Sequence, residues 1–270
     1  MTEIVAQSWS QLQDCLFDDS WNPSLHRYRS QEAFRGLSNA DYRLATTLAR
    51  LGGPYDVLEH HLLRNFRKYA VRSVVERDSL WHWLSVAQHY GLPTRLLDWT
   101  FSPYVALHFA TANEQRFDVD GAVWAVDYGK LKEHLPPQLK AKMATEGSDL
   151  FTVEMLSDTV ATLEEFRGLS DAPFALFFEP PSIDDRIVNQ SALFSLMSDV
   201  HVLLDGWLED HSGLWRKVLI PAELKPEIRD KLDQSNVTER VLFPGLDGLS
   251  RWLKRHYSPI KSAPPKLAGP

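Results

Sequence analysis

The sequence predicts an α+β fold, a mixed α/β arrangement in which strands and helices alternate along the chain. Short apolar runs rich in β-branched and aromatic residues recur along it and are typical of buried strands. Longer segments between them carry apolar residues three and four positions apart, which predicts amphipathic helices. The 270 residues contain no linker and no repeat of solenoid length, so we expect a single domain over 1–257 and a disordered, proline-rich tail over 258–270.

The segment 84–112 shows this alternation most clearly and predicts a helix, a strand and a second helix in succession. Gly91 ends the first helix, because glycine accepts the left-handed cap conformation without a Cβ clash. Residues 95–100 are short and mostly apolar, which predicts a buried strand. Ser102 is followed by proline, the pattern of an N-cap and a first helical position, so a helix is expected over 103–113.

The other elements are predicted from the same two patterns. Before the central segment they are a strand and a helix within 4–20, a polar loop over 21–32, a strand at 31–36, a strand leading into a helical turn within 42–50, and two helices within 55–89. After it they are a strand at 121–127, a mainly helical segment at 130–168, strands at 174–178, 186–196, 214–221 and 241–243, and helices at 222–234 and 246–256. We expect residues 130–170 to be an insertion or lid.

Composition narrows the classes of function. The net charge of −7 argues against a broadly basic nucleic-acid-binding surface, although a local basic cleft remains compatible with it. The single cysteine, Cys15, excludes an intrachain disulfide and, without a recognisable signal peptide, favours the cytoplasm. Because no apolar run approaches the roughly 20 residues that span a bilayer, we expect no membrane partner.

Several common catalytic patterns are missing from the chain. There is no GxGxxG, no glycine-rich loop ending in Gly-Lys-Ser/Thr, and no GxSxG. The histidines lack strong metal-ligand spacing and there is no cysteine cluster, so no metal site is expected. Basic residues scattered over 64–77 favour a solvated helix face over a phosphate-binding patch.

Polar side chains on the predicted strands carry the remaining functional signal. Arg35 stands between Phe34 and Gly36, and the absence of a side chain on glycine would let its guanidinium approach a phosphate or ribose. A structural ion pair, for example with Asp98, is an equal alternative. Arg95 and Asp98 lie in an apolar strand, so each is expected to be paired if it is buried.

Further polar groups surround this strand. Thr100 and Ser102 can hydrogen-bond a ligand, although Ser102 serves equally well as a helix cap. His89, at the end of its helix, can stack on a ligand or be a satisfied core histidine. With Gln88 and Thr94, these groups predict either a hydrogen-bonded core node or one wall of a ligand site.

The tripeptide Phe34-Arg35-Gly36 and the run QHYGLPTRLLDWT at 88–100 resemble the signature of the FRG domain family. Residues 103–110, 121–126, 189–190, 193–194 and 243–244 also match, so the resemblance spans roughly residues 8–256. The long central run is specific, whereas the tripeptide alone would be uninformative. The family is in turn distantly similar to ADP-ribosyltransferases.

That second resemblance implies a split antiparallel or mixed sheet with flanking helices and a cleft for NAD. Arg35 would hold the dinucleotide, Thr100 would take the hydroxyl role, and Gln190 stands where the arginine–serine–glutamate class carries its catalytic glutamate. The resemblance assigns binding of NAD to Phe34, Gly36, His89, Arg95, Asp98, Trp99 and Ser102. Glutamine cannot carry negative charge toward an oxocarbenium-like transition state, so either another carboxylate serves, the enzyme tolerates glutamine, or no transfer occurs. The nearest carboxylates in sequence are Glu179, Asp184 and Asp185.

The function implied is that of a nucleotide-binding transferase, an ADP-ribosyltransferase that uses NAD to modify a macromolecule. The resemblance implies a nucleic-acid or protein acceptor and a bacterial toxin or antiphage setting. The alternative is a non-catalytic nucleotide-sensing or protein-interaction domain that uses the same pocket.

Overall fold

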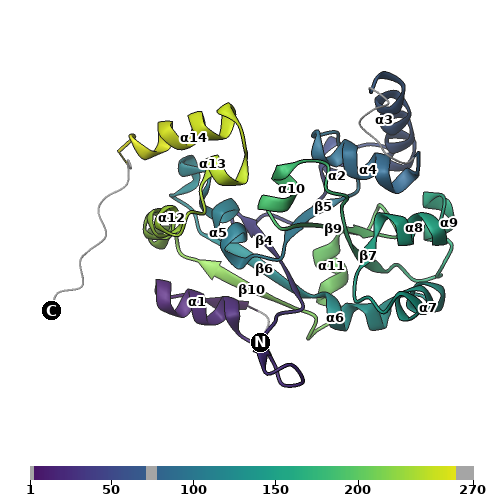
Figure 1. Cartoon of the computed structure of the whole chain (residues 1–270), viewed down its shortest axis with the longest axis horizontal. Coiled ribbons are helices and arrows are strands. Elements are labelled where there is room, and N and C mark those ends of the chain that lie inside the picture. The colour runs from purple at the N-terminus through teal and green to yellow at the C-terminus, as the bar shows by residue number, and fades with distance from the viewer. Residues whose placement is uncertain (1–2, 71–77, 260–270) are drawn as a thin grey trace.

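The computed structural model describes residues 3–70 and 78–259, and within them eight strands form one mixed sheet with helices packed around it (Figure 1). In spatial order the strands are β1 (Glu3–Val5), β10 (Trp215–Ile220), β6 (Gly121–Asp127), β4 (Glu32–Leu37), β5 (Leu97–Thr100), β9 (Ala192–Met197), β8 (Ala175–Glu179) and β7 (Phe151–Thr152). The outer pairs β1/β10 and β7/β8 are parallel and the inner pairs antiparallel. The predicted α+β class is confirmed.

Helices cover the middle of the sheet as well as its two ends (Figure 1). They are α1 (Trp9–Phe17), α2 (Thr47–Leu51), α3 (Tyr55–Tyr69), α4 (Leu80–His89), α5 (Pro103–Thr111), α6 (Tyr128–Leu131), α7 (Pro137–Glu146), α8 (Val153–Thr159), α9 (Leu163–Arg167), α10 (Asp185–Asn189), α11 (Leu204–Glu209), α12 (Lys225–Gln234), α13 (Glu239–Leu242) and α14 (Leu246–His256). Figure 1 shows α12, α13 and α14 at one end and α3, α8 and α9 at the other. No helix of the described residues is long and apolar enough to cross a membrane.

The strands β4 and β5 meet at a single residue pair, Phe34 opposite Thr100. In contrast, β4 pairs with β6 along its whole length, from Glu32 to Leu37, and β5 pairs with β9 from Leu97 to Thr100. Because the two halves of the sheet share so short a ladder, they separate beside this pair. The sheet is therefore split between β4 and β5.

The N-cap predicted at Ser102 is confirmed, and Ser8 and Ser79 take the same role at two other helices. The side chains of Ser8, Ser79 and Ser102 accept hydrogen bonds from backbone N–H groups in the first turns of α1, α4 and α5. The segment 84–112 has the predicted order, with β5 starting two residues later than expected and α5 ending at Thr111.

Two predicted strands were wrong. Residues 241 and 242 end α13, and residue 243 follows it. A three-residue apolar run is compatible with the spacing of a helix or of a strand, and burial of Leu242 in the helix decides between the two. The segment 186–196 is divided into α10 and β9. The carboxylate of Asp184 caps the first turn of α10, and Ser191 has a left-handed φ of 47°, which separates that helix from the strand.

Two shorter segments also differ from prediction. The polar loop at 21–32 contains the hairpin β2 (Trp21–Asn22) and β3 (Arg27–Tyr28), because the side chain of Asn22 accepts hydrogen bonds from Ser24 and Leu25 and closes the turn. No strand precedes the helical turn of α2 within 42–50.

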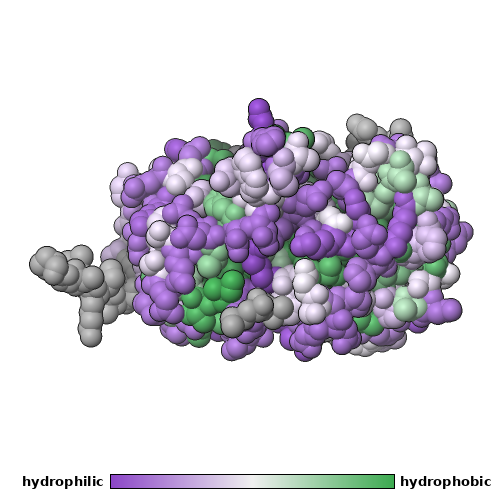
Figure 2. All heavy atoms as spheres, turned by 90° about the horizontal axis from the view of Figure 1, so that it is seen from below, coloured by the Kyte–Doolittle hydropathy of each residue, from purple (hydrophilic) through white to green (hydrophobic). Residues whose placement is uncertain are grey.

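Residues 130–170 are mainly helical, as predicted, and supply part of the core. Leu139, Phe151, Leu156 and Phe166 are fully buried in one cluster with Trp81 of α4. Figure 2 shows the face seen from below as mainly hydrophilic, with hydrophobic residues gathered in small patches. The predicted disordered tail lies, from residue 260 on, outside the described residues.

Helices α5 and α12 are joined by a buried polar pair. Nη1 of Arg229 donates to Nδ1 of His108 over 2.9 Å. His108 is 1% exposed, and burial together with the neighbouring Arg229 cation lowers the pKa of His108 to about 3. The imidazole is therefore neutral in the folded chain at neutral pH.

Acid is expected to destabilise the fold through His108. In the unfolded chain His108 binds a proton below its ordinary pKa of 6.5, whereas in the folded chain it stays neutral until about pH 3. The free energy of unfolding therefore falls as the pH is lowered from 6.5 to about 3. The loss amounts to roughly 4 kcal/mol. Urea unfolding at a series of pH values measures it, with His108→Gln as a non-titrating control that keeps an acceptor for Arg229. Parallel pH profiles of the two proteins would contradict this assignment.

Candidate functional site

A cleft of about 320 Å³ lies where the sheet splits between β4 and β5. Its walls come from segments far apart in the chain, and the polar side chains that reach it include Arg35, Arg50, Asp98, Thr100, Arg186 and Gln190. Both members of the single pair Phe34–Thr100 line it, beside the point where the two strands part. Tertiary structure thus brings Arg35 and Thr100 to one cavity, as the sequence predicts.

The guanidinium of Arg35 bridges the split. Its Nη1 donates to the backbone carbonyl of Asp98 on the facing strand, while its Nε is buried and has no hydrogen-bond partner among the described residues. Burial lowers the pKa of Arg35, the Asp98 carboxylate opposes that shift, and the Arg50 cation adds to it. A buried donor without a partner is costly, so Arg35 is suited to receive an acceptor from a ligand.

Two more guanidiniums, those of Arg50 and Arg186, line the same cleft. Neither forms an ion pair with a carboxylate of the described residues, and Arg186 lies 5.1 Å above the ring centroid of Phe243. Asp98 is the one carboxylate among the described residues that line the cleft. Three cations facing one anion favour a ligand with at least two negative charges, and planar guanidinium groups suit phosphate oxygens.

The hydroxyl of Thr100 is already engaged with protein groups. It donates to the backbone carbonyl of Gln190 over 2.6 Å and accepts from the N–H of Ser102 over 3.0 Å. The side-chain amide of Gln190 donates to the carbonyl of Leu242 over 2.9 Å. These bonds tie β5, the start of α5 and the end of α10 together, so Thr100 and Gln190 hold the cleft in shape.

A second cavity of about 520 Å³ adjoins the cleft. The two share Asp98, Arg186 and Gln190 in their walls. On the far side, Nε2 of Gln88 donates to Oδ2 of Asp98 over 2.8 Å. His89 also lines this cavity, and its Nε2 lies 2.8 Å from a carboxylate oxygen of Asp184. Both cavities fall within the range of about 300–1,000 Å³ typical of small-molecule sites.

Three of the predicted binding residues serve the scaffold of the site. Arg95 is buried, and its Nε and Nη2 donate to the carboxylate of Glu59, so it has a partner as expected. The indole N–H of Trp99 donates to Ser195 over 2.8 Å in the core. Ser102 caps α5.

Phe34 and Gly36 flank Arg35 on β4 and support α5. Phe34 is 1% exposed and packs in one apolar cluster with Ala106. A Cβ on Gly36 would lie 1.8 Å from the carbonyl oxygen of Ala106, so the glycine allows α5 to approach the strand. Close packing of α5 on β4 therefore requires glycine at position 36. The missing side chain also leaves room for the guanidinium of Arg35.

Arg50 and Arg186 were not singled out from the sequence. They stand in unrelated segments, at the end of α2 and in the first turn of α10, and no spacing connects either with Arg35. The carboxylates nearest to Gln190 in sequence line neither cavity; they are Glu179, Asp184 and Asp185. Asp184 contributes indirectly, because its carboxylate contacts His89.

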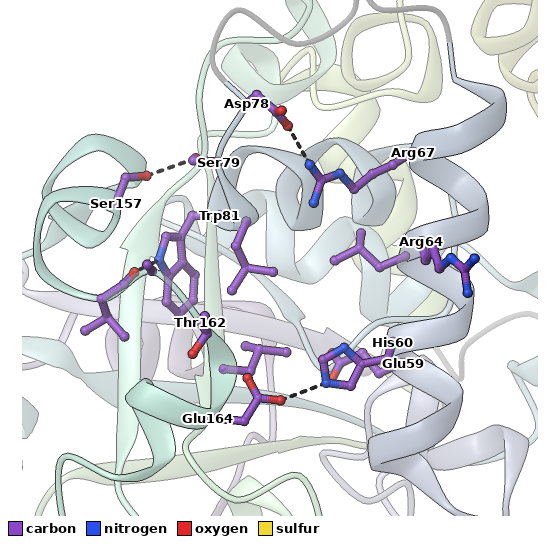
Figure 3. A pocket seen from close by; sticks show the side chains of 15 residues that line it. Glu59, His60, Arg64, Arg67, Asp78, Ser79, Trp81, Ser157, Thr162 and Glu164 are labelled. Carbon is purple, nitrogen blue, oxygen red and sulfur yellow. Dashed lines mark hydrogen bonds and ion pairs between the residues drawn. The ribbon is translucent and has the colours of Figure 1, made fainter.

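A larger cavity of about 620 Å³ lies between α3, α4, α8 and α9 (Figure 3). Its charged groups are paired with one another: His60 Nε2 lies 2.8 Å from Glu164, and Arg67 donates to Asp78 over 2.6 Å. Arg64 extends away from the cavity in Figure 3. Since its charges are largely neutralised, this cavity is a weaker candidate than the cleft; residues 71–77 of the predicted basic face lie outside the described residues.

In the described parts of the chain, no group of three or more His, Cys, Asp or Glu side chains is placed to hold a metal ion. Among known families, residues 30–119 match the family model of the FRG domain. No curated protein matches the chain, and no solved structure does. The matched segment includes Arg35, Asp98 and Thr100 and ends before Arg186.

Proposed function

Because this chain carries an FRG domain over residues 30–119, we propose that it is an ADP-ribosyltransferase that binds NAD in the Arg35 cleft. One observation carries the proposal: three guanidiniums that form no ion pair with a carboxylate of the described residues converge at the split of the sheet, and one of them keeps a buried donor with no partner among those residues. A diphosphate supplies both the negative charge and the acceptors that this arrangement lacks. The acceptor of the proposed reaction is a nucleic acid or a protein, in a toxin or antiphage module of the cytoplasm.

The two adjoining cavities support a dinucleotide in particular. Arg186 stands in the wall that they share, so a diphosphate bound there would extend one nucleoside half into each cavity. Arg35 would bind the diphosphate or the nicotinamide ribose from the cleft side. The side chain of Tyr90 lines the second cavity and is 61% exposed, so its ring offers a surface on which a base can stack.

Asp98 is the proposed catalytic carboxylate. It lines both cavities, Gln88 holds its Oδ2, and no donor of the described residues occupies its Oδ1. In the proposed transfer, an acceptor nucleophile attacks C1′ of the nicotinamide ribose and the bond to the nicotinamide nitrogen breaks. The electron pair leaves with nicotinamide, and the proton of the nucleophile passes to Asp98. The negative charge of Asp98 also stabilises the oxocarbenium-like transition state.

The uncharged, hydrogen-bonded side chain of Gln190 favours a second function, nucleotide sensing without transfer. Its uncharged amide stands where the related class has glutamate, and it is engaged with the carbonyl of Leu242. A domain of this kind would bind NAD or ADP-ribose through the same three arginines and leave the ligand intact.

Nicotinamide release from NAD by the purified protein, with nucleic-acid and protein acceptors present, tests the proposal. Asp98→Asn is expected to lower the rate about 10²-fold while NAD still binds, because it removes the base and its charge. Glu179→Gln, which changes an exposed carboxylate outside both cavities, is the matched control and should leave the rate unchanged.

The outcomes separate the two functions. NAD binding by the wild type without nicotinamide release would replace the transferase with the sensor. Full activity of Asp98→Asn would remove Asp98 from the chemistry. If the wild type neither binds nor consumes NAD at millimolar concentration, both functions fail.

A further inference from the structure

The helix α10 holds two side chains of the cleft but lies outside the sheet. Arg186 stands in its first turn and Gln190 directly after its last residue. At its start, the carboxylate of Asp184 caps the backbone and contacts His89. What fixes its other end determines where the guanidinium of Arg186 lies in the cleft.

That other end is attached to the C-terminal helices. The side-chain amide of Asn189 donates to the carbonyl of Val241 over 2.8 Å, and that of Gln190 donates to the carbonyl of Leu242 over 2.9 Å. Both carbonyls belong to α13, about fifty residues further along the chain and beyond the segment that matches the FRG domain.

The next residue, Phe243, contacts the cleft arginine directly. The guanidinium carbon of Arg186 lies 5.1 Å from its ring centroid, and that of Arg251 in α14 lies 4.3 Å away. The same ring packs against Phe109 of α5, with centroids 6.3 Å apart, and Phe109 lines the cleft. An aromatic ring attracts a guanidinium and limits its orientations, so Phe243 restricts Arg186 without consuming its donors.

The hairpin α13–α14 is itself firmly held. Arg255 donates to Glu239 over 2.7 Å and to Asp233 of α12 over 2.8 Å. Although burial raises the pKa of Glu239, the hydrogen bonds of Arg255 lower it to about 2, so this pair stays charged at neutral pH. Gly248 lets α14 lie against the backbone of Phe243, since a Cβ there would be 1.8 Å from the Phe243 carbonyl oxygen.

We infer that the hairpin α13–α14 positions Arg186 for the ligand of the cleft, with Phe243 as the positioning residue. The inference rests on the proposed function in that the ligand is taken to carry a diphosphate. In this role the hairpin supplies no group to the reaction. It sets the orientation of the Arg186 guanidinium, which would bind a phosphate.

Binding of ADP-ribose to the full chain, measured by calorimetry, tests the inference. Phe243→Leu keeps an apolar side chain but removes the ring, and is expected to weaken binding about fivefold to twentyfold. Phe243→Tyr keeps the ring and should restore wild-type affinity. Trp252→Leu removes a comparable ring–guanidinium contact of the same hairpin, with Arg240 at 4.6 Å, and should bind as the wild type does.

A double-mutant cycle separates positioning from general loosening of the fold. In an Arg186→Ala background, Phe243→Leu should change affinity less than twofold, because the group it orients is gone. An equal loss in both backgrounds, or wild-type affinity of Phe243→Leu, would overturn the inference.

The Nε–H signal of Arg186 in NMR spectra gives a readout without ligand. The ring of Phe243 should shift it, and the shift should vanish in Phe243→Leu and persist in Phe243→Tyr. Failure of the wild type to bind ADP-ribose would overturn the proposed function, and an Arg186 signal insensitive to Phe243→Leu would overturn the positioning role.

Discussion

Replacing Arg35 by alanine is expected to lower kcat/KM for NAD by about 10² to 10³, the largest functional effect of any single change in the cleft. The guanidinium is desolvated by burial, its Nε has no hydrogen-bond partner among the described residues, and Arg50 and Arg186 line the same cleft. A bound diphosphate would therefore form charge-assisted bonds with it. Loss of a desolvated, hydrogen-bonded charge partner costs about 2–5 kcal/mol. Nicotinamide release and calorimetric NAD binding measure the loss.

Two further variants show which property of Arg35 matters. Arg35→Lys keeps the charge but loses the planar fork, and is expected to recover only part of the affinity. Arg50→Ala removes an exposed cation from the same cleft and should cost much less, since solvent screens it. Because Arg35 also bridges to the Asp98 carbonyl, thermal unfolding of each variant is needed beside the assay. Equal losses for Arg35→Ala and Arg50→Ala would contradict a special role for Arg35.

Substitution of Gly36 by alanine is expected to have the largest effect on stability, a loss of more than about 3 kcal/mol. The new Cβ would lie 1.8 Å from the carbonyl oxygen of Ala106 and 2.7 Å from the backbone nitrogen of Ala110. These are backbone atoms of a buried helix, so α5 and β4 would have to separate, which opens the core. Denaturant unfolding measures the change.

Gly147→Ala is the matched control for this prediction. Gly147 ends α7 with a left-handed φ of 65°, and a Cβ there would meet nothing within 4 Å. Its replacement should cost only about 1 kcal/mol, from backbone strain alone. If the two glycine variants lose similar stability, close approach of α5 is not what Gly36 provides.

The predicted resemblance to the FRG domain rested on local signals and is supported by the family match. The run QHYGLPTRLLDWT and the Phe-Arg-Gly tripeptide led to a segment that the FRG domain match includes, and Arg35 and Thr100 do reach one cavity. The hydrogen bonds of Thr100 and Gln190 were beyond prediction, because their partners are backbone carbonyls of the α10 turn and α13. Backbone groups carry no sequence signal of their own.

Arg95 illustrates the same limit. Burial in an apolar strand required a partner, and the sequence alone predicted that a partner exists. Glu59, 36 residues earlier on α3, supplies it, because packing of α3 beside α4 brings the carboxylate to Arg95, just before β5. Asp98 is thereby left free of Arg95, with its carboxylate in the cleft.

The sequence by itself determined the α+β class, the order helix–strand–helix over 84–112 and the cap of α5, because periodicity and capping depend on neighbours a few residues apart. Tertiary structure decided the helical state of 185–189 and 239–242, where runs are too short to show a period. It also decided that Arg35, Arg50 and Arg186 meet. Their convergence depends on the single pairing of β4 with β5 and on the attachment of α10 to α13, contacts between distant segments that no local pattern encodes.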